Sequence, residues 1–181
     1  MKPALVVVDM INDFVYGSLK VERAKRIIPN IKKLLEWARR EKIPVIYACD
    51  YHREEDGEFK LWPKHAVAGS WGAQVINELK PEKGDYIVFK RRYSAFYSTD
   101  LDLLLRELSI DTLIIVGLVT NVCIQHTVCD AFFRGYKTLV PEDCVEALSE
   151  EIHRQALEYM KSIYGCEITT SSKIIGELKV E

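Results

Sequence analysis

The chain has 181 residues, of which 48% are hydrophobic, 25 are lysine or arginine and 27 are aspartate or glutamate. This length and apolar content suit one domain spanning residues 1–181, with a core between one sheet and two layers of helix. The net charge of -2 gives no electrostatic reason to expect nucleic acid or an anionic membrane as a partner, so we expect a small-molecule substrate.

Neither a membrane span nor a disulfide framework is expected. The longest apolar run, residues 113–119, is far shorter than the roughly 20 residues that cross a bilayer. The first residues are typical of a strand and not of a signal sequence, so we expect a cytoplasmic protein. The five cysteines include no Cys-x-x-Cys pair and are not crowded as in small secreted domains, so at least one thiol stays free.

Strand and helix patterns alternate along the chain. Continuous apolar runs rich in β-branched residues predict buried strands at 4–8, 44–48, 86–89, 112–116 and 136–140, with a weaker one at 167–169. Helical spacing of apolar residues predicts helices around 31–38, 101–108, 122–134 and 152–163. The alternation predicts a three-layer α/β/α fold with a mostly parallel, doubly wound sheet.

Residues 49–72 form the one irregular insertion. The segment is polar, contains glycine and proline, and is too long for an ordinary connection, so it is either functional or disordered. It carries Asp50, His52, Glu58 and His65, and imidazole together with carboxylate suits zinc, iron or manganese better than calcium. We predict a divalent metal site, with zinc as the first choice; the alternative is a polar surface loop.

Reactive residues follow the ends of several predicted strands. Ligands of open parallel sheets bind outside the carboxyl ends of the strands, which is where Asp9, Asp50, Lys90 and Cys123 fall. A carboxylate, an ammonium and a thiol at one edge are what an activated nucleophile needs. Cys123 also lies where a helix should begin, so free amides there, together with Lys90, are expected to favour the thiolate.

Structural roles remain open for the same residues. Cysteine is often a small core residue, Asp9 could cap a turn, and Lys90 lies in a charge run. His126, three residues after Cys123, offers a rival Cys/His pair.

Two other enzyme classes fit the first strand poorly. A haloacid dehalogenase-type phosphotransferase needs a second aspartate where this chain has Ile11, and a nucleotide-binding loop needs glycines that residues 9–14 lack.

Five segments together resemble the cysteine hydrolases of the isochorismatase-like family and, within it, the nicotinamidase and pyrazinamidase group. They are VVDMINDF at 7–14, DYH at 50–52, WPKH at 62–65, KRRYSAF with TDL at 90–101, and GLVTNVC at 117–123. Each is weak alone, but their order and spacing are specific. The resemblance spans nearly the whole chain.

The resemblance implies a catalytic triad of Asp9, Lys90 and Cys123, the same three residues that the strand ends indicate. It also implies a cis peptide between Leu118 and Val119, with the amides of Val119 and Cys123 as an oxyanion hole. The implied metal ligands are Asp50, His52 and His65, joined in some members by a carboxylate at the position of Glu58. The implied pyridine-binding aromatic residues are Phe14, Trp62 and Tyr93.

The implied activity is hydrolysis of nicotinamide to nicotinate and ammonia through a thioester, as in NAD salvage, by a homo-oligomer that holds a metal. A metal-independent ureido or N-carbamoyl amidohydrolase of the same family is the main alternative. From a different class, a non-catalytic binding scaffold is a further alternative. The loop histidines argue against the first, and retention of all three triad residues argues against the second.

Overall fold

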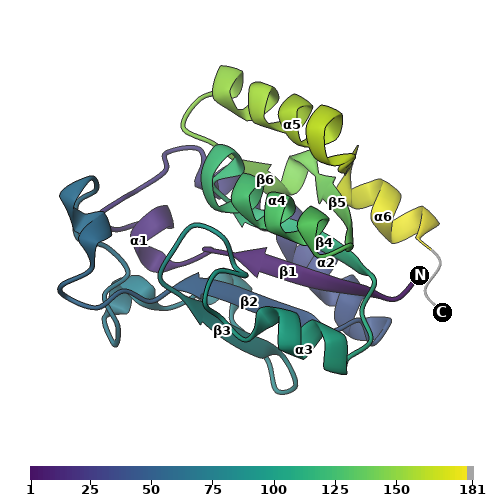
Figure 1. Cartoon of the computed structure of the whole chain (residues 1–181), viewed down its shortest axis with the longest axis horizontal. Helices are drawn as coiled ribbons and strands as arrows, with labels where there is room; N and C mark the ends of the chain where they lie inside the picture. The colour runs from purple at the N-terminus through teal and green to yellow at the C-terminus, as the bar shows by residue number, and fades with distance from the viewer. Residues whose placement is uncertain (179–181) are drawn as a thin grey trace.

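The sheet of this protein contains seven strands, all paired in parallel (Figure 1). The computed structural model describes residues 1–178. The strands are β1 (Pro3–Val8), β2 (Val45–Asp50), β3 (Tyr86–Lys90), β4 (Thr112–Leu118), β5 (Lys137–Pro141), β6 (Val145–Glu146) and β7 (Glu167–Thr169). Their order is β3-β2-β1-β4-β5-β7, with β6 paired to the end of β4. The first strand therefore lies in the middle of the sheet.

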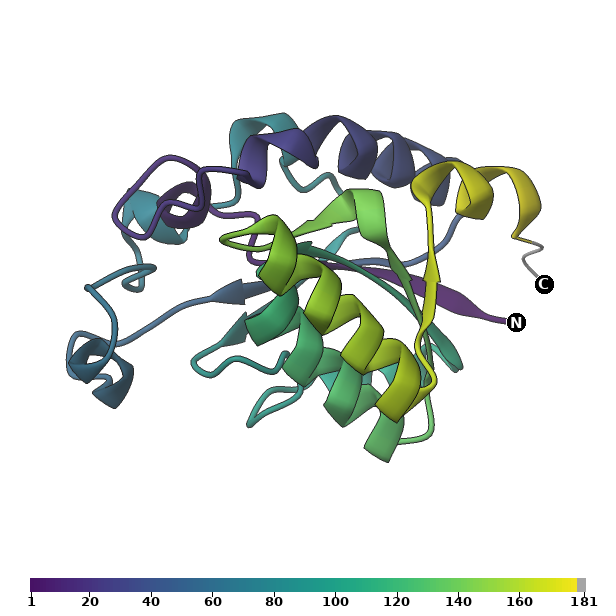
Figure 2. The same ribbon diagram turned by 90° about the horizontal axis from the view of Figure 1, so that it is seen from above.

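Helices cover both faces of the sheet (Figure 2). On one face lie α2 (Ile28–Arg40) and α6 (Ser171–Glu177). On the other lie α3 (Leu101–Glu107), α4 (Gln125–Phe133) and α5 (Glu150–Tyr164). A short helix, α1 (Asn12–Val15), follows β1. The predicted three-layer, doubly wound α/β/α architecture is confirmed.

The core consists of two apolar layers separated by the sheet. Every residue of β1, β2 and β4 is buried, as expected for continuous apolar strands covered on both faces. The buried stripe of α2 contains the predicted Ile31, Leu34, Leu35 and Ala38. Ser149 caps α5 by accepting a hydrogen bond from the amide of Ile152 at 3.3 Å, as its position predicts. In residues 1–178 no helix is long and apolar enough to cross a membrane.

Some elements differ from the sequence prediction. Between β2 and β3 there are only 3-10 turns, η2 (Gly57–Lys60), η3 (Trp71–Ala73) and η4 (Asn77–Leu79), and two more such turns lie at Ala24–Arg26 and Glu142–Cys144. The helix expected at 122–134 begins with a π-helical turn, η5 (Thr120–Ile124), which carries the nucleophile candidate. The short elements α1, β6 and α6 were not predicted, because pieces of two to seven residues give little periodic signal.

Candidate active site

Asp9, Lys90 and Cys123 meet at the carboxyl edge of the sheet. Asp9 follows β1, Lys90 ends β3 and Cys123 lies in η5, after β4. The Lys90 Nζ atom lies 2.8 Å from Asp9 Oδ2 and 3.5 Å from Cys123 Sγ. All three residues are buried, with exposed fractions of 0%, 1% and 4%. The structure therefore brings these three residues together, as the sequence predicts.

The ends of β1 and β4 lie unusually close together beside Asp9. Gly117 has a φ of +114°, and a Cβ atom there would lie 2.0 Å from the carbonyl oxygen of Val8. Asp9, the residue that follows β1, has a φ of +52°, which is uncommon for a residue other than glycine. Strained backbone of this kind clusters at functional sites. Only glycine at position 117 lets β4 lie this close to the point where Asp9 turns inward.

Asp50 joins the triad to the insertion. It ends β2, opposite Lys90 in the register of the sheet, and its Oδ1 atom accepts a hydrogen bond from Lys90 Nζ at 2.5 Å. Its backbone amide donates to Asp9 Oδ1 at 2.8 Å. The Oδ2 atom of the same carboxylate lies 3.6 Å from His52 Nε2 and 3.9 Å from His65 Nε2. One carboxylate therefore contacts both the ammonium of the triad and the histidines of the loop.

Burial and neighbouring charges set the protonation states. Burial, reinforced by Asp50 and opposed by Lys90, raises the pKa of Asp9 to about 6. Burial alone would lower the pKa of Lys90, but Asp50 and Asp9 outweigh it and raise that pKa well above its usual range. Lys90 is therefore a permanent cation between two carboxylates.

The protonation state of the Cys123 thiol differs from the sequence prediction. We expected Lys90 and the helix start to favour the thiolate, and Lys90 does act in that direction. Burial, however, is the largest influence, and together with Asp9 and Asp50 it raises the pKa of Cys123 well above its usual range. The resting group is a thiol beside a carboxylate that can take its proton.

The four predicted metal ligands form one cluster. One donor atom each from Asp50, His52, Glu58 and His65 lies within 4.8 Å of all the others. Glu58 Oε1 lies 3.9 Å from His52 Nε2 and 3.8 Å from His65 Nε2. Both Nε2 atoms are buried and lack a hydrogen-bond partner within residues 1–178. Buried nitrogen atoms aimed at the same carboxylates, without partners of their own, fit a cation between them.

Each histidine is oriented by its other ring nitrogen. His52 Nδ1 lies 2.9 Å from Asp56 Oδ2, and Asp56 in turn accepts hydrogen bonds from the Arg91 guanidinium. His65 Nδ1 donates to the carbonyl oxygen of Pro63 at 2.7 Å. With Nδ1 occupied in this way, Nε2 is left to face the cluster, as in metal-binding histidines. Asp56 and Arg91 were not identified from the sequence, where Arg91 was part of a charge run.

The charges of the cluster also fit a divalent cation. The side chains of Asp9, Asp50 and Glu58 are at most 8% exposed, and among them lies one ammonium, that of Lys90. Burial and the charge of Asp50 raise the pKa of Glu58, which shows that the carboxylates repel one another. Three buried carboxylates beside one cation leave an excess of two negative charges, which a divalent ion would offset. Two imidazoles and two carboxylates suit zinc, iron or manganese.

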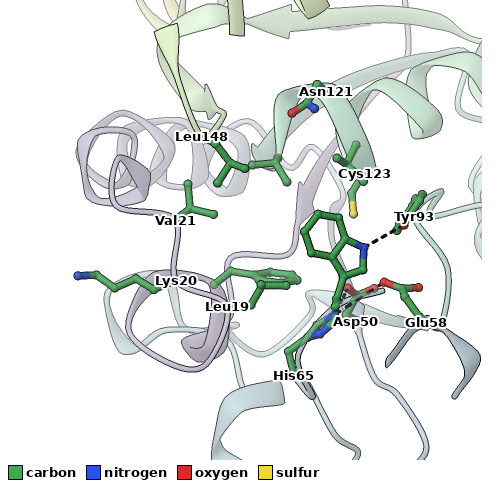
Figure 3. Close-up of a pocket in the computed structure, with 14 residues that line it drawn as sticks. Leu19, Lys20, Val21, Asp50, Glu58, His65, Tyr93, Asn121, Cys123 and Leu148 are labelled. Atoms are coloured by element: carbon green, nitrogen blue, oxygen red, sulfur yellow. Dashed lines mark hydrogen bonds and ion pairs between the residues drawn. The ribbon is translucent and has the colours of Figure 1, made fainter. Parts of the chain in front are cut away.

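An apolar cavity of about 230 Å³ opens over these groups (Figure 3). Its floor carries Cys123, Asp50, Glu58 and His65, and Figure 3 shows Leu19, Val21 and Leu148 on the opposite side. The three predicted aromatic residues, Phe14, Trp62 and Tyr93, all line it.

The aromatic residues contact the rest of the site. Trp62 Nε1 donates a hydrogen bond to the Tyr93 hydroxyl at 3.1 Å, drawn dashed in Figure 3, and the Phe14 ring lies 5.4 Å from that of His65. The cavity fits a small aromatic molecule between a thiol and the ligand cluster.

The backbone before Cys123 has the expected form. The peptide between Leu118 and Val119 is cis, and both Val119 and Cys123 line the cavity. His126 is engaged elsewhere: its Nδ1 atom donates to the carbonyl oxygen of Val122 at 2.7 Å, and its ring lies 5.4 Å from that of Tyr93. This geometry does not favour the rival Cys/His pair.

Comparison with known proteins identifies the family of this chain. The Isochorismatase domain family matches residues 3–173. The chain belongs to the isochorismatase family. The N-carbamoylsarcosine amidase of Thermoplasma acidophilum is 38% identical, with a TM-score of 0.90 and 99% of each chain covered. The nicotinamidase/pyrazinamidase PncA of Bacillus subtilis is 33% identical, with a TM-score of 0.89, covering 93% of this chain and 100% of that chain.

A third isochorismatase-family structure bears on the metal. The pyrazinamidase of Pyrococcus horikoshii, in complex with zinc, is 29% identical, with a TM-score of 0.88, covering 94% of this chain and 99% of that chain. The family match makes this chain a hydrolase of the isochorismatase family. The similar proteins differ in the substrates that their names give, so family membership alone does not specify the substrate of this chain.

Proposed function

We propose that this protein is a metal-containing cysteine amidohydrolase that converts nicotinamide to nicotinate and ammonia. The observation that carries the proposal is the shared cavity: Cys123 and three members of the ligand cluster, Asp50, Glu58 and His65, line one aromatic-walled space. Asp9, whose pKa is raised, lies beside Cys123 and contacts the same Lys90 ammonium. The thiol and carboxylate supply acyl transfer, and the cluster supplies a fixed point at which an aromatic nitrogen can be held.

Acylation uses the chain's own groups. The Cys123 sulfur attacks the carboxamide carbon while its proton passes to Asp9, which is possible because the pKa of Asp9 is raised to about 6. The carbonyl electrons move onto oxygen, which the amides of Val119 and Cys123 stabilise. Collapse breaks the C–N bond, and Asp9 returns the proton to the departing ammonia. A thioester on Cys123 remains.

Deacylation reverses the proton transfers. Asp9 takes a proton from water as the water oxygen attacks the thioester, and the proton then returns to sulfur as the C–S bond breaks. The product is nicotinate. Lys90, held 2.8 Å from Asp9 and 3.5 Å from Cys123, stabilises whichever of these two groups carries the negative charge.

Asp50, His52, Glu58 and His65 would hold the metal. A bound metal would act there as a Lewis acid for the ring nitrogen, which would orient the carboxamide toward Cys123. We propose zinc, because imidazole and carboxylate ligands suit it and because the Pyrococcus horikoshii relative binds it.

The charged groups around the cavity favour nicotinamide over a ureido compound as the substrate. N-carbamoylsarcosine carries a carboxylate, so a metal-independent site for it should offer a side-chain cation. Among the described residues that line the cavity, the only lysine or arginine is Lys20, and Lys90 lies next to the cavity, 3.5 Å from Cys123 Sγ. Lys90 is paired with Asp9 and Asp50, and the Lys20 ammonium lies 2.9 Å from Glu22. The cavity therefore favours a neutral ring amide over an anionic ureido compound.

Ammonia release from purified protein tests the proposal, with nicotinamide and N-carbamoylsarcosine as paired substrates and elemental analysis alongside. Release from nicotinamide that chelation abolishes and zinc restores is the expected result. Release from N-carbamoylsarcosine alone, unaffected by chelation, would instead establish the ureido alternative. No release from either compound, with Cys123 no more reactive than Cys129 toward an alkylating agent, would indicate a binding scaffold.

A further inference from the structure

A buried carboxylate outside the triad and the ligand cluster lies between the loops that form the site. Asp13, in α1, is 9% exposed. Its Oδ1 atom accepts a hydrogen bond from the amide of Ser18 at 3.1 Å, and its Oδ2 atom accepts one from the amide of Ala66 at 2.7 Å. Hydrogen bonds from backbone amides to a buried carboxylate are strong and fix both partners. Asp13 therefore joins two segments that are 48 residues apart in sequence.

Two glycines enclose the same carboxylate. A Cβ atom on Gly17 would lie 2.2 Å from Asp13 Oδ1, and one on Gly72 would lie 1.9 Å from Asp13 Oδ2. Neither distance is possible for real atoms, so glycine at these two positions is required by space. The backbone at three places, near residues 17, 66 and 72, packs directly against one side chain.

The bond to Ala66 reaches both histidine ligands. Ala66 directly follows His65, so holding its amide fixes the end of the His65 backbone. The carbonyl oxygen of Ala66 accepts a hydrogen bond from the amide of His52 at 2.8 Å, and the amide of Ala68 donates to the carbonyl oxygen of His52 at 2.8 Å. A continuous set of hydrogen bonds thus runs from Asp13 through Ala66 to His52.

The backbone around Asp13 also supports the wall of the cavity. The backbone carbonyl oxygen of Asp13 accepts a hydrogen bond from the amide of Leu19 at 3.1 Å, and Leu19 lines the cavity. Ser18 Oγ donates to the carbonyl oxygen of Lys64 at 2.8 Å, next to His65. Phe14, the residue after Asp13, lies against the His65 ring.

We propose that Asp13 is a positioning residue, which sets the separation of His52 and His65 and thereby the affinity of the ligand cluster for a divalent metal. Asp13 itself does not point a free oxygen at the cluster, since both oxygens are bonded to amides. This proposal rests on the metal site of the proposed function. Partners that orient a ligand from outside typically change metal affinity by roughly 10- to 100-fold when removed.

The test is zinc affinity of the full chain, measured by competition with a chromogenic chelator. Asp13→Asn keeps the size of the side chain but replaces one accepting oxygen with a donor, so one amide loses its partner. We expect zinc to bind roughly 10- to 100-fold more weakly. As a matched control, Asp143 also accepts two hydrogen bonds, from the amide and hydroxyl of Ser171 at 2.8 and 2.5 Å, and neither residue lines the cavity or belongs to the ligand cluster. Asp143→Asn should lower Tm but leave zinc affinity unchanged.

The outcomes are distinct. Unchanged zinc affinity in a folded Asp13→Asn protein overturns the proposal, and so does an equal loss in Asp143→Asn, which would mean that general destabilisation is responsible. If Asp13→Asn does not fold, Gly72→Ala takes its place, because the added Cβ displaces Asp13 Oδ2 while the carboxylate itself stays. Unchanged zinc affinity in Gly72→Ala would also overturn the proposal. Wild-type protein that binds no zinc refutes the metal part of the proposed function instead.

Discussion

The two halves of the site are built in different ways. The triad residues lie at or just beyond the ends of β1, β3 and β4, where the parallel register already brings their backbones together. His52, Glu58 and His65 lie in a segment whose regular structure near them is the single turn η2 and an isolated β-bridge between His52 and Val67. Side-chain contacts from Asp13, Asp56 and Arg91 hold that segment in place.

This difference indicates which substitutions each half should tolerate. The sheet positions the triad through many backbone hydrogen bonds and a fully buried core, so single polar substitutions nearby should leave its geometry intact. The ligand cluster depends on a few polar contacts, so the loss of one contact should lower the metal affinity.

The largest effect is expected at the nucleophile. Cys123→Ala should lower nicotinamide turnover by about 10⁴-fold or more, because no other group in the cavity can form the thioester. Cys129→Ala, on α4 and outside the cavity, should retain turnover. Mass spectrometry of quenched reactions should detect an acyl adduct on the wild type only. Comparable turnover in Cys123→Ala would refute the triad.

Loss of the buried Lys90 ammonium should lower the free energy of unfolding. Lys90→Met leaves Asp9 and Asp50 without their shared partner, and removing one member of a buried ion pair typically costs about 3 to 5 kcal/mol. Lys64 pairs with Glu54 on the surface, so Lys64→Met should change stability by less than about 1 kcal/mol. Urea denaturation measures both. Equal effects for the two variants would contradict the contrast between buried and exposed pairs.

Loss of a metal ligand should weaken zinc more than loss of Asp13. His65→Ala and His52→Ala should each exceed the roughly 10- to 100-fold reduction expected for an outer partner, and should raise KM for nicotinamide. His126→Ala is the matched histidine control, with metal content and turnover expected to stay near those of the wild type. Elemental analysis and steady-state kinetics provide the readout. If His126→Ala abolishes turnover in a folded protein, the Cys/His pair has to be reconsidered.

The smallest effect concerns the pH dependence of stability in chelator-treated protein. The pKa of Asp9 is raised to about 6, above its usual value, so the native state binds more protons than the unfolded state between about pH 4 and 6. Stability from this group is therefore lost as the pH rises through that window. Asp9→Asn has no carboxyl group to titrate, so it should be more stable than wild type at pH 7 by on the order of 3 kcal/mol, but not at pH 4. Urea denaturation at both pH values measures this. The same difference in unfolding free energy between Asp9→Asn and wild type at pH 4 and at pH 7 would contradict the prediction.

Much of the fold could be predicted because its signals are local. Continuous apolar runs identified six strands to within a few residues, and the spacing in α2 and α5 identified their buried faces. The two-residue strand β6 and the short helices α1 and α6 were missed, because their existence depends on what they pack against. The protonation of Cys123 was also misjudged, since the burial that raises its pKa is a property of the folded chain.

The residue types of the site and their order could be predicted from the sequence: a carboxylate, an ammonium and a thiol at strand ends, and four potential ligands in one insertion. These features could be predicted because strand ends and ligand spacing are local properties of the chain. The folded structure was needed to see that Asp50 contacts both Lys90 and the histidines, that Asp56 orients His52, and that Asp13 joins Ser18 to Ala66. Those contacts join residues whose nearness depends on how the whole chain packs, and no local pattern records it.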